Sequence, residues 1–100
     1  MFDEEGFLVD LDQWSEALAE NIASREGIVL TDAHWQLVHL ARAYYQQFDL
    51  SPEMRPFIKW LVPYLGKDNA KSLYLLRLFP GSPTKLISKV AGLPKPANCI

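Results

Sequence analysis

Cysteine is the scarcest reactive residue in this 100-residue chain, which holds a single one, Cys99. One thiol excludes an internal disulfide and any metal cluster built on several cysteines. The two histidines, His34 and His39, have no further ligand at metal-binding spacing, so we expect no metal site and no bound cofactor. The sequence also lacks a glycine-rich phosphate loop, a paired-carboxylate motif and a Ser/His/Asp arrangement. The candidate for chemistry is therefore Cys99.

Long apolar runs are absent as well. No stretch approaches the roughly 18 apolar residues that a membrane span requires. The first residues, Met1-Phe2-Asp3-Glu4-Glu5, are acidic, unlike the basic start of a secretory signal peptide. These two observations predict a cytoplasmic protein without a membrane partner. In that reducing compartment Cys99 stays a free thiol.

Basic residues are scarce in the first half of the chain. Residues 1–50 contain ten acidic and two basic side chains, a net charge of −8, and residues 51–100 contain two acidic and eight basic ones, a net charge of +6. The two halves sum to the overall −2. This asymmetry predicts a basic face near the C-terminus that attracts an acidic protein or a nucleic acid. The alternative is that the charges only solvate the exteriors of helices.

Hydrophobic residues make up 49% of the sequence, which is enough for one domain with its own core. Their spacing predicts a mainly α fold, a small orthogonal bundle of about five helices. Asp10 or Asp12 is the expected cap of the first helix and Thr31 that of the second, while Pro52 and Pro83 suit first-turn positions. Phe7-Leu8-Val9 forms either a short N-terminal β segment or an extended entry. The expected helices span roughly 12–25, 32–48, 52–66, 68–78 and 83–91.

A separate arm is predicted after Gly92. Pro94 and Pro96 block helix formation and hold the chain in extended, polyproline-like geometry. We therefore expect a helical domain over residues 1–92 and a flexible C-terminal arm over 93–100 that carries Cys99. At ~3.1 Å per residue, the segment from Gly92 to Cys99 reaches about 20–25 Å from the body. We interpret the arm as a device that delivers the thiol into the active site of another protein.

Two stretches near the C-terminus resemble a known family. They are Leu78-Phe79-Pro80-Gly81-Ser82-Pro83-Thr84-Lys85 and Lys89-Val90-Ala91-Gly92-Leu93-Pro94-Lys95-Pro96, followed by the penultimate Cys99. Together they closely resemble the C-terminal signature of the DsrC/TusE family, and upstream matches such as Trp14 and Arg42 extend the resemblance over the chain from Gly6. Ser82 and Thr84 depart from the signature, where glycine and alanine are usual. The family usually begins about ten residues earlier, with a strand that pairs into an N-terminal hairpin. Here that strand is missing or the start is shortened, so Phe7-Leu8-Val9 is expected to be an unpaired extended segment.

The resemblance also distinguishes two branches of the family by their cysteines. Members that work with dissimilatory sulfite reductase have a second cysteine eleven residues before the penultimate one, a position occupied here by Ser88. A serine forms no disulfide, so the chain resembles the TusE branch. Members of that branch accept persulfide sulfur from the TusBCD complex and pass it toward the tRNA thiouridylase MnmA, which makes 2-thiouridine at the wobble position. The resemblance thus implies a sulfurtransferase that carries persulfide sulfur on Cys99 for tRNA thiolation.

Sulfur transfer requires a thiolate, because the thiolate attacks the persulfide sulfur of the donor. An unperturbed thiol is only slightly ionised at neutral pH, and the C-terminal carboxylate opposes the nearby Lys95. We therefore expect the partner's pocket to activate the thiol. The basic residues near the arm, together with a pair one helical turn apart, are the candidate partner-binding residues, although they are equally explained as solvated helix exteriors: Lys85, Lys89, Lys95, Arg55 and Lys59.

Two other functions are consistent with parts of the sequence. One is a DsrC-like role in sulfite reduction, sulfur oxidation or gene regulation. Ser88 argues against the reductase role and gives no information on a role in regulation. The other is a nucleic-acid-binding helical module, since short turns join the helices and the C-terminal half is basic. Against that module, the net charge is acidic and Cys99 has no purpose in it.

Overall fold

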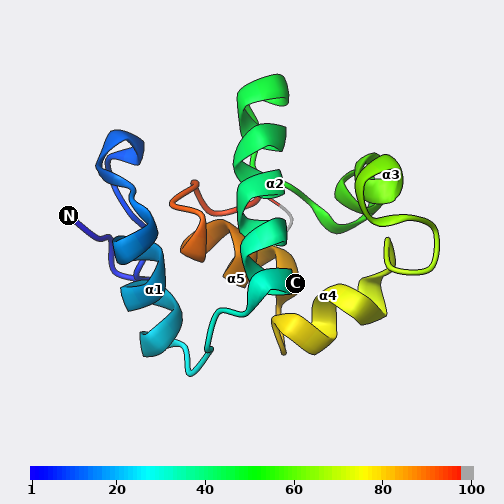
Figure 1. Ribbon diagram of the computed structural model, residues 1–100. Helices are drawn as coiled ribbons and strands as arrows, with labels where there is room; N and C mark the ends of the chain where they lie inside the picture. Colours follow the sequence, from blue (N-terminus) through cyan, green and yellow to red (C-terminus); the bar gives the residue numbers. More distant parts are fainter. Residues whose placement is uncertain (98–100) are drawn as a thin grey trace.

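The protein folds around one long central helix, and the structure, a computed structural model, describes residues 1–97. The helices are α1 (Glu16–Arg25), α2 (Asp32–Phe48), α3 (Met54–Leu65), α4 (Ser72–Leu78) and α5 (Pro83–Val90), with a 3₁₀ turn (Leu11–Gln13) before α1. Figure 1 shows α2 in the middle, α1 on one side of it, and α3 and α4 on the other. Helix α5 packs against α1, α2 and α4, so it joins the two sides. The prediction of a mainly helical bundle is confirmed.

Helix α2 has the bounds that its sequence predicts. Thr31 and His34 form a capping box at its start, in which His34 Nδ1 accepts the backbone N–H of Thr31 at 3.2 Å. At its end Asp49 adopts a left-handed conformation, φ 56°, and its N–H donates to the Tyr45 carbonyl at 2.7 Å. Because both ends are set by residues next to the helix, local sequence is enough to place it.

Helix α1 begins later than predicted. Ser15 caps it, since the Ser15 Oγ accepts the Leu18 N–H at 3.1 Å. Asp10 caps the preceding 3₁₀ turn instead, through the Asp12 N–H. At the other end Gly27 adopts φ +75° directly after the C-cap Glu26, as expected of a glycine that stops a helix.

Helices α3 and α4 are also shorter than predicted at their starts. The N-cap of α3 is Glu53, so Pro52 precedes the helix rather than occupying its first turn. Helix α4 begins at Ser72, four residues after the predicted start, because residues 67–71 form turns. Helix α5 does begin with Pro83 in its first turn.

The core lies where α2 meets α5. Apolar residues of every helix join one cluster there, and its members without solvent exposure are Ala19, Ala23, Leu37, Val38, Ala41, Phe57, Leu61, Leu75, Phe79, Ile87, Val90 and Ala91. Removing such a side chain from water contributes about 1.5–3 kcal/mol for the larger members. Since α5 supplies two large members and its C-cap, the element that leads into the arm is fixed by the core itself.

The N-terminal segment pairs with itself. Phe2 and Leu8 form an isolated antiparallel bridge, the Asp3 N–H donates to the Phe7 carbonyl at 2.8 Å, and the Val9 N–H donates to the Met1 carbonyl at 2.8 Å. The expectation that Phe7-Leu8-Val9 is unpaired is therefore wrong, because residues 1–3 supply a partner. The pairing buries Phe7 and Leu8, which are 2% and 4% exposed.

Among residues 1–97, no helix combines the length and the apolar character that a bilayer crossing requires.

Candidate functional site

The end of α5 sets the path of the predicted arm. Ala91 is the C-cap, and Gly92 follows with φ +72°. The Gly92 N–H donates to the Lys89 carbonyl at 3.2 Å and the Leu93 N–H donates to the Ser88 carbonyl at 2.9 Å. These two bonds are those of a Schellman motif, which reverses the chain at a defined angle.

Two side chains hold the last carbonyls of α5, Trp14 from the link between the 3₁₀ turn and α1, and Arg42 from α2. Trp14 Nε1 donates to the Val90 carbonyl at 2.9 Å, and Arg42 Nη1 donates to the Ala91 carbonyl at 2.7 Å. The guanidinium carbon of Arg42 also lies 4.0 Å from the centroid of the Trp14 ring. A cation at a helix C-terminus interacts favourably with the helix dipole. We call Trp14, Arg42 and Gly92 the root clamp, because together they fix the point where the chain leaves α5.

Gly92 is required by this clamp for two reasons. Its positive φ disfavours residues with a side chain, and a Cβ at this position would overlap the Trp14 ring. Burial meanwhile lowers the pKa of the half-buried Arg42 guanidinium. An arginine side chain nevertheless keeps its charge in proteins. The clamp therefore combines close packing with a permanent charge.

The described part of the arm lies against the body. Leu93 is 2% exposed and belongs to the core cluster, and Pro96 is buried. The Ser51 hydroxyl donates to the Pro94 carbonyl at 2.5 Å, and Lys95 Nζ donates to Glu5 Oε1 at 2.9 Å. The hydrogen bond from Lys95 is the main cause that lowers the pKa of Glu5. The flexibility of the arm as a whole stays a prediction.

Cys99 lies outside the described residues, so its part in the site rests on its place in the sequence. Ser88 is described, and it is fully buried on α5. Its hydroxyl oxygen has no hydrogen-bond partner among residues 1–97. A serine here excludes the two-thiol chemistry that the resemblance associates with a cysteine at this position.

The predicted basic residues do not form one group. Lys85 and Lys89 both line a hollow of about 510 Å³ beside α4 and α5, which Arg77, His34 and Glu26 also line. Arg55 and Lys59 are exposed on α3 and do not line it, and Lys95 pairs with Glu5. Arg55 and Lys59 on α3 therefore stand apart from Lys85 and Lys89, and the role of all five bases in partner binding stays a prediction.

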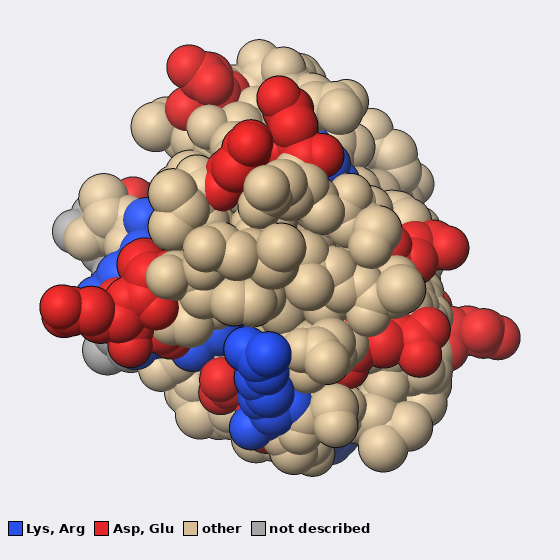
Figure 2. All heavy atoms as spheres, turned by 90° about the vertical axis from the view of Figure 1, so that its left-hand side faces the viewer, with Lys and Arg blue, Asp and Glu red and all other residues tan. Residues whose placement is uncertain are grey.

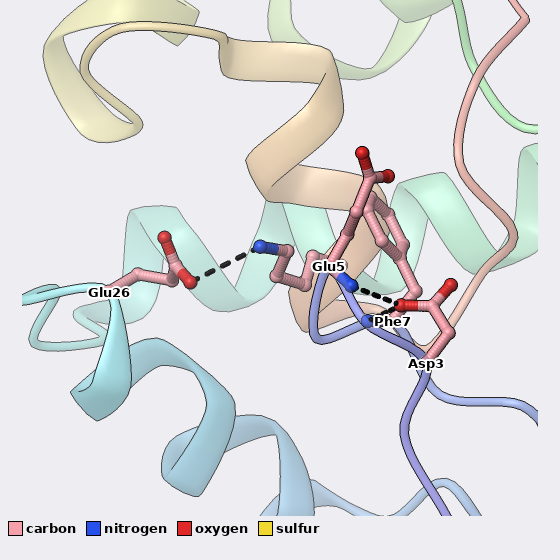
Figure 3. Close-up of polar contacts among 5 residues, drawn as sticks. Asp3, Glu5, Phe7 and Glu26 are labelled. Carbon is pink, nitrogen blue, oxygen red and sulfur yellow. Dashed lines mark hydrogen bonds and ion pairs between the residues drawn. The ribbon is translucent and has the colours of Figure 1, made fainter.

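Lys89 is buried, which its charge alone does not predict. It is 7% exposed, its Nζ lies 3.3 Å from Glu26 Oε2, and it stands 5.2 Å from the centroid of the Phe7 ring. Figure 3 shows the ion pair to Glu26, and the Asp3 carboxylate accepting the N–H groups of Glu5 and Phe7 at 2.9 Å each. The turn around Asp3 thus holds Phe7 where it packs against Lys89. The role of Lys89 in partner binding stays a prediction.

Sequence reasoning missed the residues that hold the arm. Trp14 and Arg42 matched the family pattern but received no role, and Glu5 and Ser51 gave no signal. The interactions that define the clamp join residues 76 and 49 positions apart in the chain, so no spacing rule reveals them.

His34 is buried and hydrogen-bonded, whereas His39 lies on the surface. His34 is 8% exposed, with Nδ1 on Thr31 and Nε2 2.8 Å from the Leu78 carbonyl. Because a carbonyl only accepts, Nε2 carries the proton. His39 is exposed, stacks on Trp35 and lies 3.0 Å from Glu16. No group of three potential metal ligands occurs among the residues the structure describes.

Known proteins resemble this chain over nearly its full length. Residues 1–100 match the family model described as DsrC like protein. The Sulfurtransferase TusE of Sodalis glossinidius is 49% identical over 98 residues, covering 98% of this chain and 91% of that protein. The Sulfurtransferase TusE of Yersinia pseudotuberculosis is 47% identical over 98 residues, with the same coverage of both.

Two solved structures share the fold. DsrC of Allochromatium vinosum superposes with a TM-score of 0.88 at 37% identity, covering 99% of this chain and 88% of that one. The oxidized gamma-subunit of the dissimilatory sulfite reductase (DsrC) from Archaeoglobus fulgidus superposes with a TM-score of 0.85 at 33% identity, covering 100% and 91%. Since sequence and fold agree along the entire chain, this protein belongs to the DsrC-like family.

Proposed function

We propose that this protein is a sulfur carrier that takes persulfide sulfur on Cys99 and passes it to an acceptor. The observation that carries the proposal is the single cysteine at the end of the family's C-terminal signature. Curated relatives that match nearly the whole chain are named Sulfurtransferase TusE, which confirms the predicted sulfur-transfer role. The root clamp supports it further, because it gives the segment that leads to Cys99 a fixed origin on the body.

The transfer is a thiol exchange without net oxidation. The Cys99 thiolate attacks the outer sulfur of the donor persulfide, R–S–SH, so the donor's S–S bond breaks and a new one forms at Cys99. The products are Cys99–S–SH and the donor thiolate R–S⁻. An acceptor thiolate then repeats the exchange and restores the Cys99 thiolate. The basic residues nearest the arm have carboxylate partners, so we infer that the donor and acceptor pockets supply the activation.

The sulfur relay that best fits this protein is the one described above for the TusE branch. The donor would be a TusBCD-like complex and the acceptor an MnmA-like thiouridylase with its tRNA, in the cytoplasm. Lys85, Lys95, Arg55 and Lys59 are the candidate contacts with these partners, and Lys89, which is buried and lines the hollow, is a further candidate. A basic surface of this kind suits acidic partner surfaces or tRNA phosphates.

A DsrC-like role in sulfite reduction is the second candidate, because the superposed structures are DsrC proteins. Ser88 opposes it, since the buried hydroxyl cannot form a disulfide with Cys99. Binding to a sulfite reductase together with loss of exchange with a persulfide donor would favour this candidate.

The test is to incubate the purified protein with a persulfide donor and to determine peptide masses. We expect the C-terminal peptide to gain the mass of one or more sulfur atoms, and the gain to disappear on reduction. The matched control is Cys99→Ser, which should gain nothing. Equal gain by Cys99→Ser would overturn the proposal.

A further inference from the structure

An apolar groove opens between α3, α4 and the start of α5, on the side of the molecule away from α1. Its volume is about 430 Å³. Met54 lines it from α3, Leu73 and Leu76 from α4, and Pro83 from α5. In Figure 1, α3 and α4 lie on the opposite side of α2 from the N-terminal segment. None of the residues in the root clamp lines this groove, so it is a feature separate from the site.

The two leucines of α4 are unusually open to solvent. Leu73 is 57% exposed and Leu76 is 42% exposed, although both are large apolar side chains. Their spacing of three residues places them on one face of the helix. The other face of α4 buries Leu75 in the core, so the helix is anchored on one side and presents leucines on the other. Exposed apolar residues that gather at a groove mark a surface that another molecule covers.

The charge around the groove indicates what that molecule is. Of the five charged residues adjacent in sequence to lining positions, Arg77 and Lys85 line the other hollow, and the remaining three are the exposed Arg55 and Lys71 and the half-buried Glu53. Residues 54–78 contain five bases and one acid, a net charge of +4. A surface with an apolar floor and a basic rim complements a segment that is apolar on one face and acidic on the other. Nucleic acid suits the rim but not the leucine floor.

The groove and the arm lie at opposite ends of α5. Pro83 is at the first turn of α5 and the root clamp is at its last, so eight residues separate them. At about 1.5 Å per residue, this helix spans roughly 12 Å. A protein held in the groove therefore lies about one length of α5 from the point where the arm begins. Because α5 is fixed in the core, the distance between the groove and the start of the arm stays constant.

We propose that the groove of Met54, Leu73, Leu76 and Pro83 is a docking surface for an acidic, amphipathic segment of a protein that exchanges sulfur with Cys99. The inference rests on the proposed function, and it names the surface and the chemistry of the partner for that exchange. Docking at the groove supplies affinity, while the arm supplies the thiol. The leucines provide the buried contact and the basic rim steers the partner to it.

The experiment uses two probes, a purified TusBCD-type donor complex and a purified MnmA-type acceptor. Binding is measured in a Cys99→Ser background, so the result does not depend on sulfur transfer. The variant is Leu73→Gln with Leu76→Gln, and the control is Leu50→Gln with Val29→Gln, which changes residues that are 65% and 83% exposed outside the groove. We expect the groove variant to raise the Kd for at least one probe by about tenfold or more, and the control to leave both Kd values unchanged.

A charge variant tests the rim separately. Arg55→Glu with Lys71→Glu should slow association with the same probe, and the effect should shrink as salt is raised, because exposed charges are screened. Loading of Cys99 by a small persulfide is expected to be the same in all variants that retain Cys99. Thermal unfolding and circular dichroism check that each variant is folded, as expected for exposed positions.

Three results would overturn the proposal. The first is unchanged Kd for both probes in the folded groove variant. The second is a wild-type dimer, detected by sedimentation, that the groove variant dissociates, because the groove would then be a contact between two copies. The third is a groove variant that loses tRNA binding while its binding to both protein probes is intact. If wild-type Cys99 takes up no sulfur while the groove variant still loses a probe, the sulfur-carrier function fails and the docking surface stands.

Discussion

Trp14 makes three contacts at once where the chain leaves α5. Its indole N–H bonds to the Val90 carbonyl, its ring face receives Arg42, and its edge fills the space in which a Cβ of residue 92 would lie. The ring is therefore both a hydrogen-bond donor and a packing surface. At the scale of single residues, the origin of the arm depends on one aromatic ring and on the absence of one methyl group.

Replacing Gly92 by Ala tests this packing, and Gly27→Ala is its matched control. Both glycines have positive φ, +72° and +75°, but only Gly92 has Trp14 beside it, while nothing lies within 4 Å of a Cβ at Gly27. Gly27→Ala should lower the free energy of unfolding by about 1–2 kcal/mol, the cost of the left-handed backbone. Gly92→Ala should lower it by roughly 2–5 kcal/mol, because overpacking adds to that cost. Urea unfolding measures both, and equal losses would contradict the clamp.

At the scale of elements, the arm is held by contacts of unequal strength. Leu93 belongs to the core, whereas the bond between Lys95 and Glu5 is exposed on both sides. Exposed ion pairs are weak because water and salt screen them. The arm is therefore attached firmly at Leu93 and lightly at Lys95.

The light attachment should depend on pH. The hydrogen bond from Lys95 is the first cause that lowers the pKa of Glu5. A carboxyl whose pKa is lowered in the folded state keeps its contact above its ordinary pKa and loses it as pH falls through the lowered value. A nitroxide attached to Cys99 should therefore become more mobile below the ordinary range of glutamate. Glu5→Gln should remove this pH step and Glu4→Gln should keep it; a step that survives in Glu5→Gln would disprove the assignment.

At the scale of the whole molecule, charge is distributed unevenly. Residues 1–26 contain eight acids and one base, a net charge of −7, and Figure 2 shows acidic side chains spread over the face that carries the N-terminal segment and α1. Residues 54–78 carry the opposite sign, on the other side of α2 (Figure 1). Such polarity orients an approaching partner before contact. Under the proposed function, this polarity would orient the body of the carrier toward a charged partner.

Insertions of three flexible residues at two places test whether the anchored arm matters for the whole molecule. An insertion after Gly92 should displace Leu93 and the later contacts, whereas one after Pro96 leaves them in place. Both add the same length, but the first frees a longer segment and lowers the effective concentration of the thiol more. Transfer from a docked donor should slow more with the first insertion, while reaction with a small thiol reagent stays constant. Equal slowing would mean that only total length counts.

Local sequence determined the helical class and the bounds of α2, because Thr31, His34 and Asp49 act on backbone groups within one turn of themselves. The sequence also singled out Cys99, since a lone thiol needs no structure to be recognised. Its predictions were weaker at the starts of α1, α3 and α4, where several capping residues compete within a few positions. Only the tertiary structure decided that residues 1–3 pair with residues 7–9, that Lys89 is buried on Glu26, and that Trp14 and Arg42 meet the end of α5. The physical reason is range: caps and periodicity act over a few residues, whereas these contacts exist only once the core has brought distant segments together.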